Sequence, residues 1–147
     1  MEQELLGTTR EIVDFARGKM ANKSDLCKKF GLDVSLPLFV FIGRLVKEKG
    51  ADLFPSVIYK SLLNKDVNII IFSEGKTEIE SELRSLQIHF KDNYACEIGF
   101  NEQLAHQIYA GSDFLLMPSR VEPCGLNQMY ALRYGTIPIV RRTGGLN

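Results

Sequence analysis

Five short apolar runs alternate with amphipathic segments over most of the chain, which limits the fold to a small set. The runs predict strands at residues 38–42, 67–72, 95–98, 114–117 and 137–140, and the segments between them predict helices at 51–63, 77–90, 102–110 and 126–134. A strand–helix–strand unit repeated with short connections favours a doubly wound, parallel α/β sheet. Because Pro138 has no N–H to donate, the last strand is expected at an edge of the sheet.

The first 35 residues follow a different pattern. They are polar, with two stretches of helical apolar spacing, and Gly31 is expected to end the second helix. We therefore divide the chain into a helical connecting segment, residues 1–35, and an α/β domain, residues 36–147. Since the chain stops directly after a Gly-Gly turn, we expect the domain to be incomplete and the sequence to be a piece of something larger.

Composition excludes several classes of protein. Lys and Arg together number 18, as do Asp and Glu together, so the formal net charge is zero. A nucleic-acid-binding protein normally has an excess of basic residues, and this chain has none. The longest apolar run is about a third of a membrane span, and the N-terminus has no signal-peptide pattern. The three cysteines and two histidines lack the spacing of a disulfide framework or a zinc site. We expect a soluble, cytoplasmic domain without a metal.

Ligands of doubly wound sheets bind at the carboxyl ends of the strands, so the residues that follow each strand are the candidates. After the first strand, Arg44 and Lys49 could hold an anion, with Lys47 as a bystander. A solvated basic loop is the alternative. A dinucleotide fingerprint is absent there, and Gly75-Lys76-Thr77 lacks the earlier glycine of a phosphate loop because position 70 is Ile70.

The loop after the fourth predicted strand is richer in candidates. Glu122 could accept hydrogen bonds from the hydroxyl groups of a sugar, or serve only as part of a cap. Gly125 precedes a predicted helix whose free N–H groups favour an anion. Arg141 and Arg142 add positive charge to the same edge after the last strand. The combination predicts an anionic ligand with hydroxyl groups, such as a nucleotide sugar.

Three segments carry a resemblance to a known family. Residues 43–52 (GRLVKEKGAD), 111–128 (GSDFLLMPSRVEPCGLNQ) and 134–146 (YGTIPIVRRTGGL) resemble the C-terminal domain of bacterial glycogen synthases and starch synthases. The resemblance extends over residues 37–147 and is densest in its second half. It implies one Rossmann-like half of a two-domain GT-B glycosyltransferase.

The resemblance also implies an activity. Enzymes of this family are retaining glucosyltransferases that transfer glucose from ADP-glucose to the 4-hydroxyl at the non-reducing end of an α-1,4-glucan, without a metal or other cofactor. Their N-terminal domain binds the glucan and supplies a histidine to the catalytic site. That domain is missing here, so we expect half a site, weak binding of ADP or ADP-glucose, and little or no catalysis by this chain alone.

Roles for individual residues follow from the same resemblance. Arg44 and Lys49 would hold the diphosphate and stabilise the leaving ADP. Glu122 would bind hydroxyls of the donor glucose, and Phe100 stands where the family places a tyrosine against the adenine. The backbone at Cys124, Gly125, Leu126 and Asn127 would contact sugar and phosphate, and Tyr130 replaces a glutamate that often binds the ribose in the wider superfamily.

Two alternatives remain open. The first is a related retaining glycosyltransferase that uses a UDP- or GDP-sugar, and the second is a non-catalytic nucleotide-binding module.

The glycine-rich turn that the family usually has after its second strand is reduced here to Ser73-Glu74-Gly75-Lys76, so its close approach to the ligand is not expected.

Overall fold

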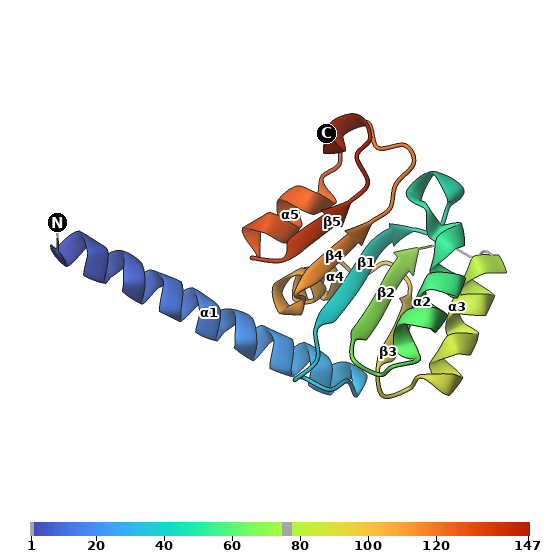
Figure 1. Cartoon of the computed structure of the whole chain (residues 1–147), viewed down its shortest axis with the longest axis horizontal. Helices are drawn as coiled ribbons and strands as arrows, with labels where there is room; N and C mark the ends of the chain where they lie inside the picture. Colours follow the sequence, from blue (N-terminus) through green and yellow to red (C-terminus); the bar gives the residue numbers. More distant parts are fainter. Residues whose placement is uncertain (1, 75–77) are drawn as a thin grey trace.

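The computed structural model describes residues 2–74 and 78–147 (Figure 1). The predicted Gly75-Lys76 turn and the predicted helix start at Thr77 lie outside these residues. The strands are β1 (Leu38–Arg44), β2 (Asn68–Glu74), β3 (Tyr94–Ile98), β4 (Phe114–Met117) and β5 (Ile137–Val140). The helices are α1 (Glu2–Phe30), α2 (Phe54–Leu62), α3 (Glu78–His89), α4 (Glu102–Gly111) and α5 (Asn127–Arg133). Short 3-10 turns are η1 (Lys47–Lys49), η2 (Ala51–Leu53) and η3 (Gly144–Leu146).

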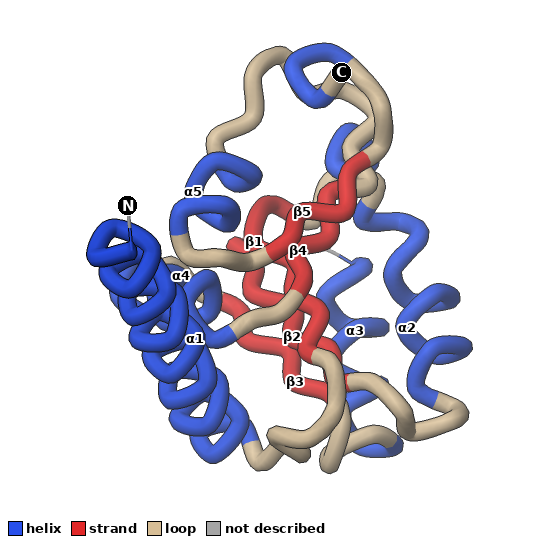
Figure 2. Tube along the Cα trace, turned by 60° about the vertical axis from the view of Figure 1, so that its left-hand side comes forward, coloured by secondary structure: helices blue, strands red, loops and turns tan. Residues whose placement is uncertain are grey.

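The strands form one parallel sheet in the order β3-β2-β1-β4-β5, which confirms the doubly wound prediction. Helices α2 and α3 cover one face, whereas α1, α4 and α5 lie on the other (Figure 2). β5 is at an edge, as Pro138 predicted. Among the described helices, none is both long enough and apolar enough to cross a membrane.

The sheet separates two hydrophobic clusters. Val40 and Ile70 point into the cluster on the α1 and α4 side, whereas Phe41, Ile69 and Ile71 point into the cluster beneath α2 and α3. This division follows from the two-residue repeat of a strand, which sends successive side chains to opposite faces. The apolar runs of β1 and β2 are therefore central strands with two buried faces.

The two predicted N-terminal helices are one continuous helix of 29 residues. Gly18 lies inside it without ending it, because a glycine in a helix costs only about 1 kcal/mol relative to alanine. Gly31 does end it, as predicted: its φ is +69°, and Leu32 N–H donates to Cys27 O at 2.9 Å. The division of the chain at residue 35 stays a prediction.

The second half of α1 is fixed to the α/β domain by polar contacts. Lys23 Nζ lies 2.7 Å from Asp113 Oδ2, which also accepts the N–H of Leu38 at 2.8 Å. Lys19 Nζ donates to Thr136 Oγ1 at 2.6 Å and to Tyr109 O at 3.2 Å. Burial of the ammonium group lowers the pKa of Lys19 to about 8, although Asp113 opposes the change.

This lowered pKa predicts a pH-dependent stability. Between pH 8 and pH 10.5 the unfolded chain binds more protons at Lys19 than the folded chain. The contribution of Lys19 to the free energy of unfolding therefore increases as the pH rises. Lys19→Met removes the titration. The free energy of unfolding of the wild type minus that of the variant should therefore increase from pH 8 to pH 10.5, measured by urea denaturation.

Lys60→Met is the control, because Lys60 is exposed on α2. Its difference from the wild type should stay constant over the same pH range. A constant difference for Lys19→Met as well would contradict the prediction.

Candidate functional site

The loops that follow the strands gather at the carboxyl edge of the sheet (Figure 1). The turn after β1 includes η1 and η2, and the loops after β4 and β5 lie beside it. Arg120 N–H donates to Glu48 O at 2.7 Å, and Gly145 N–H donates to Glu122 O at 2.8 Å. Three loops that are far apart in the sequence thus form one surface.

A cavity of about 350 Å³ opens at this edge. Its wall contains the predicted binding residues Phe100, Asn127 and Tyr130. The side chain of Phe100 is 79% exposed, so the ring is not held by the core and its face is available to a flat ligand. Asn127 Nδ2 donates to Ile42 O at 2.7 Å, which joins the start of α5 to the end of β1.

A charged pair forms a second feature of this edge. Lys49 Nζ is ion-paired with Glu122 Oε2, and the same oxygen accepts a hydrogen bond from Ser119 Oγ at 3.2 Å. The carboxylate is buried, with 8% of the side chain exposed. Two residues predicted from separate loops are therefore brought into direct contact.

The other cations of this edge differ in their surroundings. Arg44 ends β1 and is exposed, as are Arg141 and Arg142 after β5. Within residues 13–74 and 78–147 none of these three is in an ion pair. Lys47 is exposed, and its backbone carbonyl accepts from Arg120.

The loop from Glu122 to Leu126 lies against the Gly-Gly turn. A Cβ on Gly144 would contact Glu122 O, and one on Gly145 would contact Cys124 O, so glycine is required for this approach. The Cys124 thiol is exposed. Helix α5 begins one residue later than predicted, and the N–H groups of Met129 and Tyr130 are the ones that donate to Leu126 O. The N–H groups at the start of α5, before Met129, have no acceptor within the helix.

The predicted site residues therefore form two neighbouring groups. Phe100, Asn127 and Tyr130 line the cavity, and Lys49 and Glu122 form the ion pair, with Cys124, Gly125 and Leu126 in the segment between Glu122 and Asn127. Arg44 lies at the end of β1, next to Gly43 of the cavity wall. Their chemical roles stay predictions. No group of three potential metal ligands is found among the residues described.

Sequence reasoning missed several residues of this edge. His106 was given no binding role, but it lines the cavity together with Glu102 and Tyr109, and its Nδ1 lies 3.0 Å from Tyr134 Oη. The signal was their spacing, since positions 102, 106 and 109 lie on one face of a helix. Ser119 follows β4 but was given no role, and its hydroxyl donates to the carboxylate of Glu122, three positions later.

The turn after β1 yields a prediction for Gly50. Its φ is +74°, and a Cβ there would lie 2.5 Å from Pro118 O. Gly50→Ala should lower the free energy of unfolding by about 1–3 kcal/mol, because alanine disfavours this conformation and the added methyl group meets backbone. Urea denaturation measures the change.

Gly18→Ala provides the matched control. Gly18 is helical and a Cβ there would meet nothing within 4 Å. This variant should raise the free energy of unfolding by about 0.5–1 kcal/mol. Equal effects of the two substitutions would contradict the proposed constraint at Gly50.

The chain is similar to glycogen and starch synthases. It is 56% identical to a glycogen synthase of Flavobacterium johnsoniae, over 99% of this chain and 31% of that protein. It is 49% identical to soluble starch synthase 1 of Solanum tuberosum, over 88% of this chain and 20% of that protein. The chain thus spans less than a third of the length of these relatives.

A solved structure shows the same fold. The catalytic domain of starch synthase IV from Arabidopsis thaliana, bound to ADP and acarbose, matches with a TM-score of 0.79 and 40% identity, over 88% of this chain and 27% of that one. WaaG, a glycosyltransferase of lipopolysaccharide biosynthesis, has a TM-score of 0.65 at 17% identity, over 85% of this chain and 34% of that one. The fold is that of one Rossmann-like half of a GT-B glycosyltransferase. Residues 22–147 match the family described as glycosyl transferases group 1, and the chain therefore belongs to that family.

Proposed function

We propose that this chain is the donor-binding part of a retaining glucosyltransferase that acts in glycogen or starch synthesis. It would transfer glucose from ADP-glucose to the 4-hydroxyl at the non-reducing end of an α-1,4-glucan. The observation that carries the proposal is the 56% identity to a glycogen synthase over 99% of the chain. The enzyme would act in the cytoplasm, and a separate N-terminal domain would bind the glucan and complete the catalytic site.

The cavity beside Phe100 is the proposed nucleoside site. The exposed Phe100 ring would stack on the adenine, and Tyr130 lies on the same wall near the expected ribose. The volume of about 350 Å³ is in the range of small-molecule sites. Support also comes from starch synthase IV, whose catalytic domain is bound to ADP and acarbose and matches 88% of this chain.

The proposed diphosphate and sugar sites meet at the ion pair. Lys49 and Arg44 would bind the diphosphate, and Glu122 would accept hydrogen bonds from glucose hydroxyls. The backbone at Cys124, Gly125, Leu126 and Asn127 would contact both parts of the donor. When the bond between glucose and the β-phosphate breaks, negative charge grows on ADP, and fixed cations stabilise that charge more in the transition state than in the ground state.

The nucleotide preference is testable by calorimetry. ADP titrated into the full-length protein that contains this chain should bind saturably, and UDP should bind more weakly. Arg44→Ala should weaken ADP binding by about 10–100-fold, because a charged hydrogen-bonding group contributes about 1.5–3 kcal/mol. Arg84→Ala, on an exposed position of α3, should leave the affinity unchanged.

Tighter binding of UDP or GDP than of ADP would instead favour a transferase of another nucleotide sugar. Unchanged ADP affinity in Arg44→Ala would show that Arg44 is not a phosphate ligand.

The division of the site between two domains gives a second test. The full-length protein should extend a glucan primer with ADP-glucose, and residues 1–147 alone should show no measurable extension, because the acceptor site and a catalytic histidine would be missing. The assay follows glucose incorporation into glucan. A robust rate from residues 1–147 alone would contradict the proposed division, and binding without transfer by the full-length protein would favour a non-catalytic nucleotide-binding module.

A further inference from the structure

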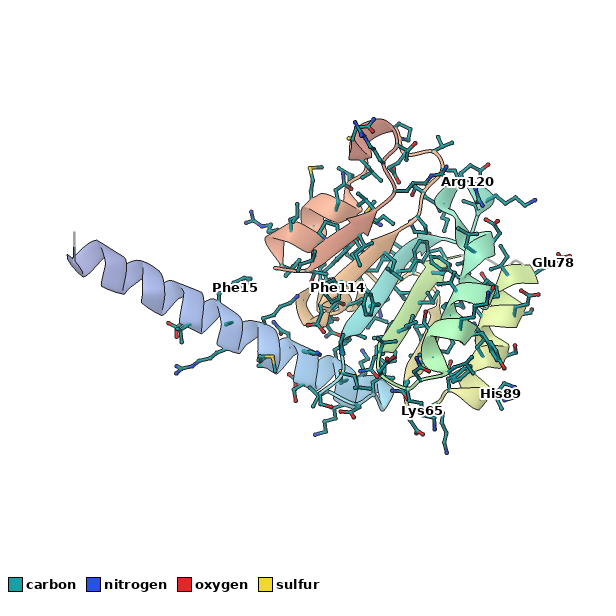
Figure 3. All side chains as sticks on the ribbon, in the orientation of Figure 1. Phe15, Lys65, Glu78, His89, Phe114 and Arg120 are labelled. Carbon is teal, nitrogen blue, oxygen red and sulfur yellow. The ribbon has the colours of Figure 1, made fainter. Side chains whose placement is uncertain are left out.

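The side chain of Arg120 joins the loop after β4 to the turn after β1 (Figure 3). Its Nη1 and Nη2 donate to the two carboxylate oxygens of Asp52 at 2.5 and 3.0 Å. Nη1 also donates to Lys47 O at 2.7 Å, while the backbone N–H of Arg120 donates to Glu48 O at 2.7 Å. Both the side chain and the backbone of one residue therefore hold the same turn.

The sheet itself does not hold these two loops together. β1 and β4 pair only at Phe39 with Phe114 and at Val40 with Leu115. Beyond that point β1 continues along β2 as far as Arg44, and β4 continues along β5 as far as Met117. The loops extend beyond this pairing, so contacts between them help to set their relative position.

The two-pronged contact between Arg120 and Asp52, called the fork below, is close in sequence to the Lys49–Glu122 pair in both loops. Lys49 is two residues after Lys47, and Glu122 is two residues after Arg120. We infer that Arg120 is a positioning residue, whose fork on Asp52 fixes the spacing of Lys49 and Glu122 without touching the donor. This inference rests on the proposed function for the roles of Lys49 and Glu122 in binding diphosphate and sugar.

The surroundings of Arg120 differ from those of Arg44. Its guanidinium group is occupied by a carboxylate and a carbonyl, whereas Arg44 is exposed and unpaired among the described residues. The hydrogen bonds from Arg120 hold the pKa of Asp52 below its ordinary value, so the partner is ionised at neutral pH. Thr143 Oγ1 donates to Arg120 O at 3.1 Å, which adds the loop after β5 to the assembly.

The first test uses steady-state kinetics of the full-length protein with ADP-glucose and a glucan primer. Arg120→Gln, Arg120→Lys and Asp52→Asn should each lower kcat by about 10–100-fold while the KM for the donor changes less than about threefold, because misplaced groups lose transition-state interactions first. Lysine cannot reproduce a two-pronged contact, so it should not restore kcat. The double variant Asp52→Asn/Arg120→Gln should be no slower than the slower single variant.

Arg84→Gln is the matched control and should keep the wild-type kcat. Three outcomes would overturn the inference. In the first, Arg120→Lys restores activity, Arg120→Gln raises the donor KM and Asp52→Asn has no effect, as expected if Arg120 binds phosphate directly. In the second, kcat is unchanged in every variant. In the third, kcat falls only in proportion to the loss of folded protein.

A second test does not depend on catalysis. The energetic coupling between Lys49→Met and Glu122→Gln is measured by a double-mutant cycle in urea denaturation, with Arg120 present and again with Arg120→Gln or Arg120→Lys. Coupling should be present with Arg120 and lost in both replacements. Coupling that persists in both, or that is absent even with Arg120, would overturn the inference. Failure of the full-length protein to use ADP-glucose would refute the proposed function and leave this measurement intact.

Discussion

The short pairing between β1 and β4 determines how the ligand edge is built. These strands share only two residue pairs before each continues beside its other neighbour. The connection after β1 leads to α2 on one face of the sheet, whereas the connection after β4 leads to α5 on the other face (Figure 2). The connections that leave β1 and β4 therefore diverge, and a crevice forms at their carboxyl ends, as doubly wound sheets generally show. The amide of Asn127 binds the Ile42 carbonyl, which β4 does not reach.

The strands were predictable because continuous apolar runs in the sequence indicate buried strands. Val40, Ile70 and Leu115 lie in continuous apolar runs, and each is fully buried. The ends of the strands were less accurate: β1 and β2 continue to Arg44 and Glu74, since Gly43 and Arg44 pair with Ser73 and Glu74. The hydrogen bonds at the end of a strand depend on the partner strand, and the apolar pattern of one strand does not reveal that partner. The two N-terminal helices expected from the sequence form one helix, α1, which packs on α4, and such packing supplies most helical stability in proteins.

The candidate site divides in a similar way. Phe100 follows a predicted strand, whereas Asn127 and Tyr130 were named from the family resemblance, and all three line one cavity. The contacts between them were not predictable. Lys49 and Glu122 are separated by 73 positions, and Asp52 and Arg120 by 68. Gly50 lies between Lys49 and Asp52, and its lack of a side chain lets the turn after β1 approach Pro118.

The cations of this edge differ in whether a carboxylate balances their charge. Lys49 is balanced by Glu122, and Arg120 is balanced by Asp52, so each of these pairs adds little net charge. Arg44 has no such partner within the described residues and lies next to the cavity wall. A diphosphate bound as we propose would meet Arg44 as an uncompensated charge and would compete with Glu122 for Lys49. If the donor places its phosphates near Lys49 and its sugar hydroxyls near Glu122, the Lys49–Glu122 ion pair is replaced by contacts of Lys49 with phosphate and of Glu122 with sugar. A bare phosphate would lack the second set, so this arrangement favours a sugar nucleotide over a simple anion.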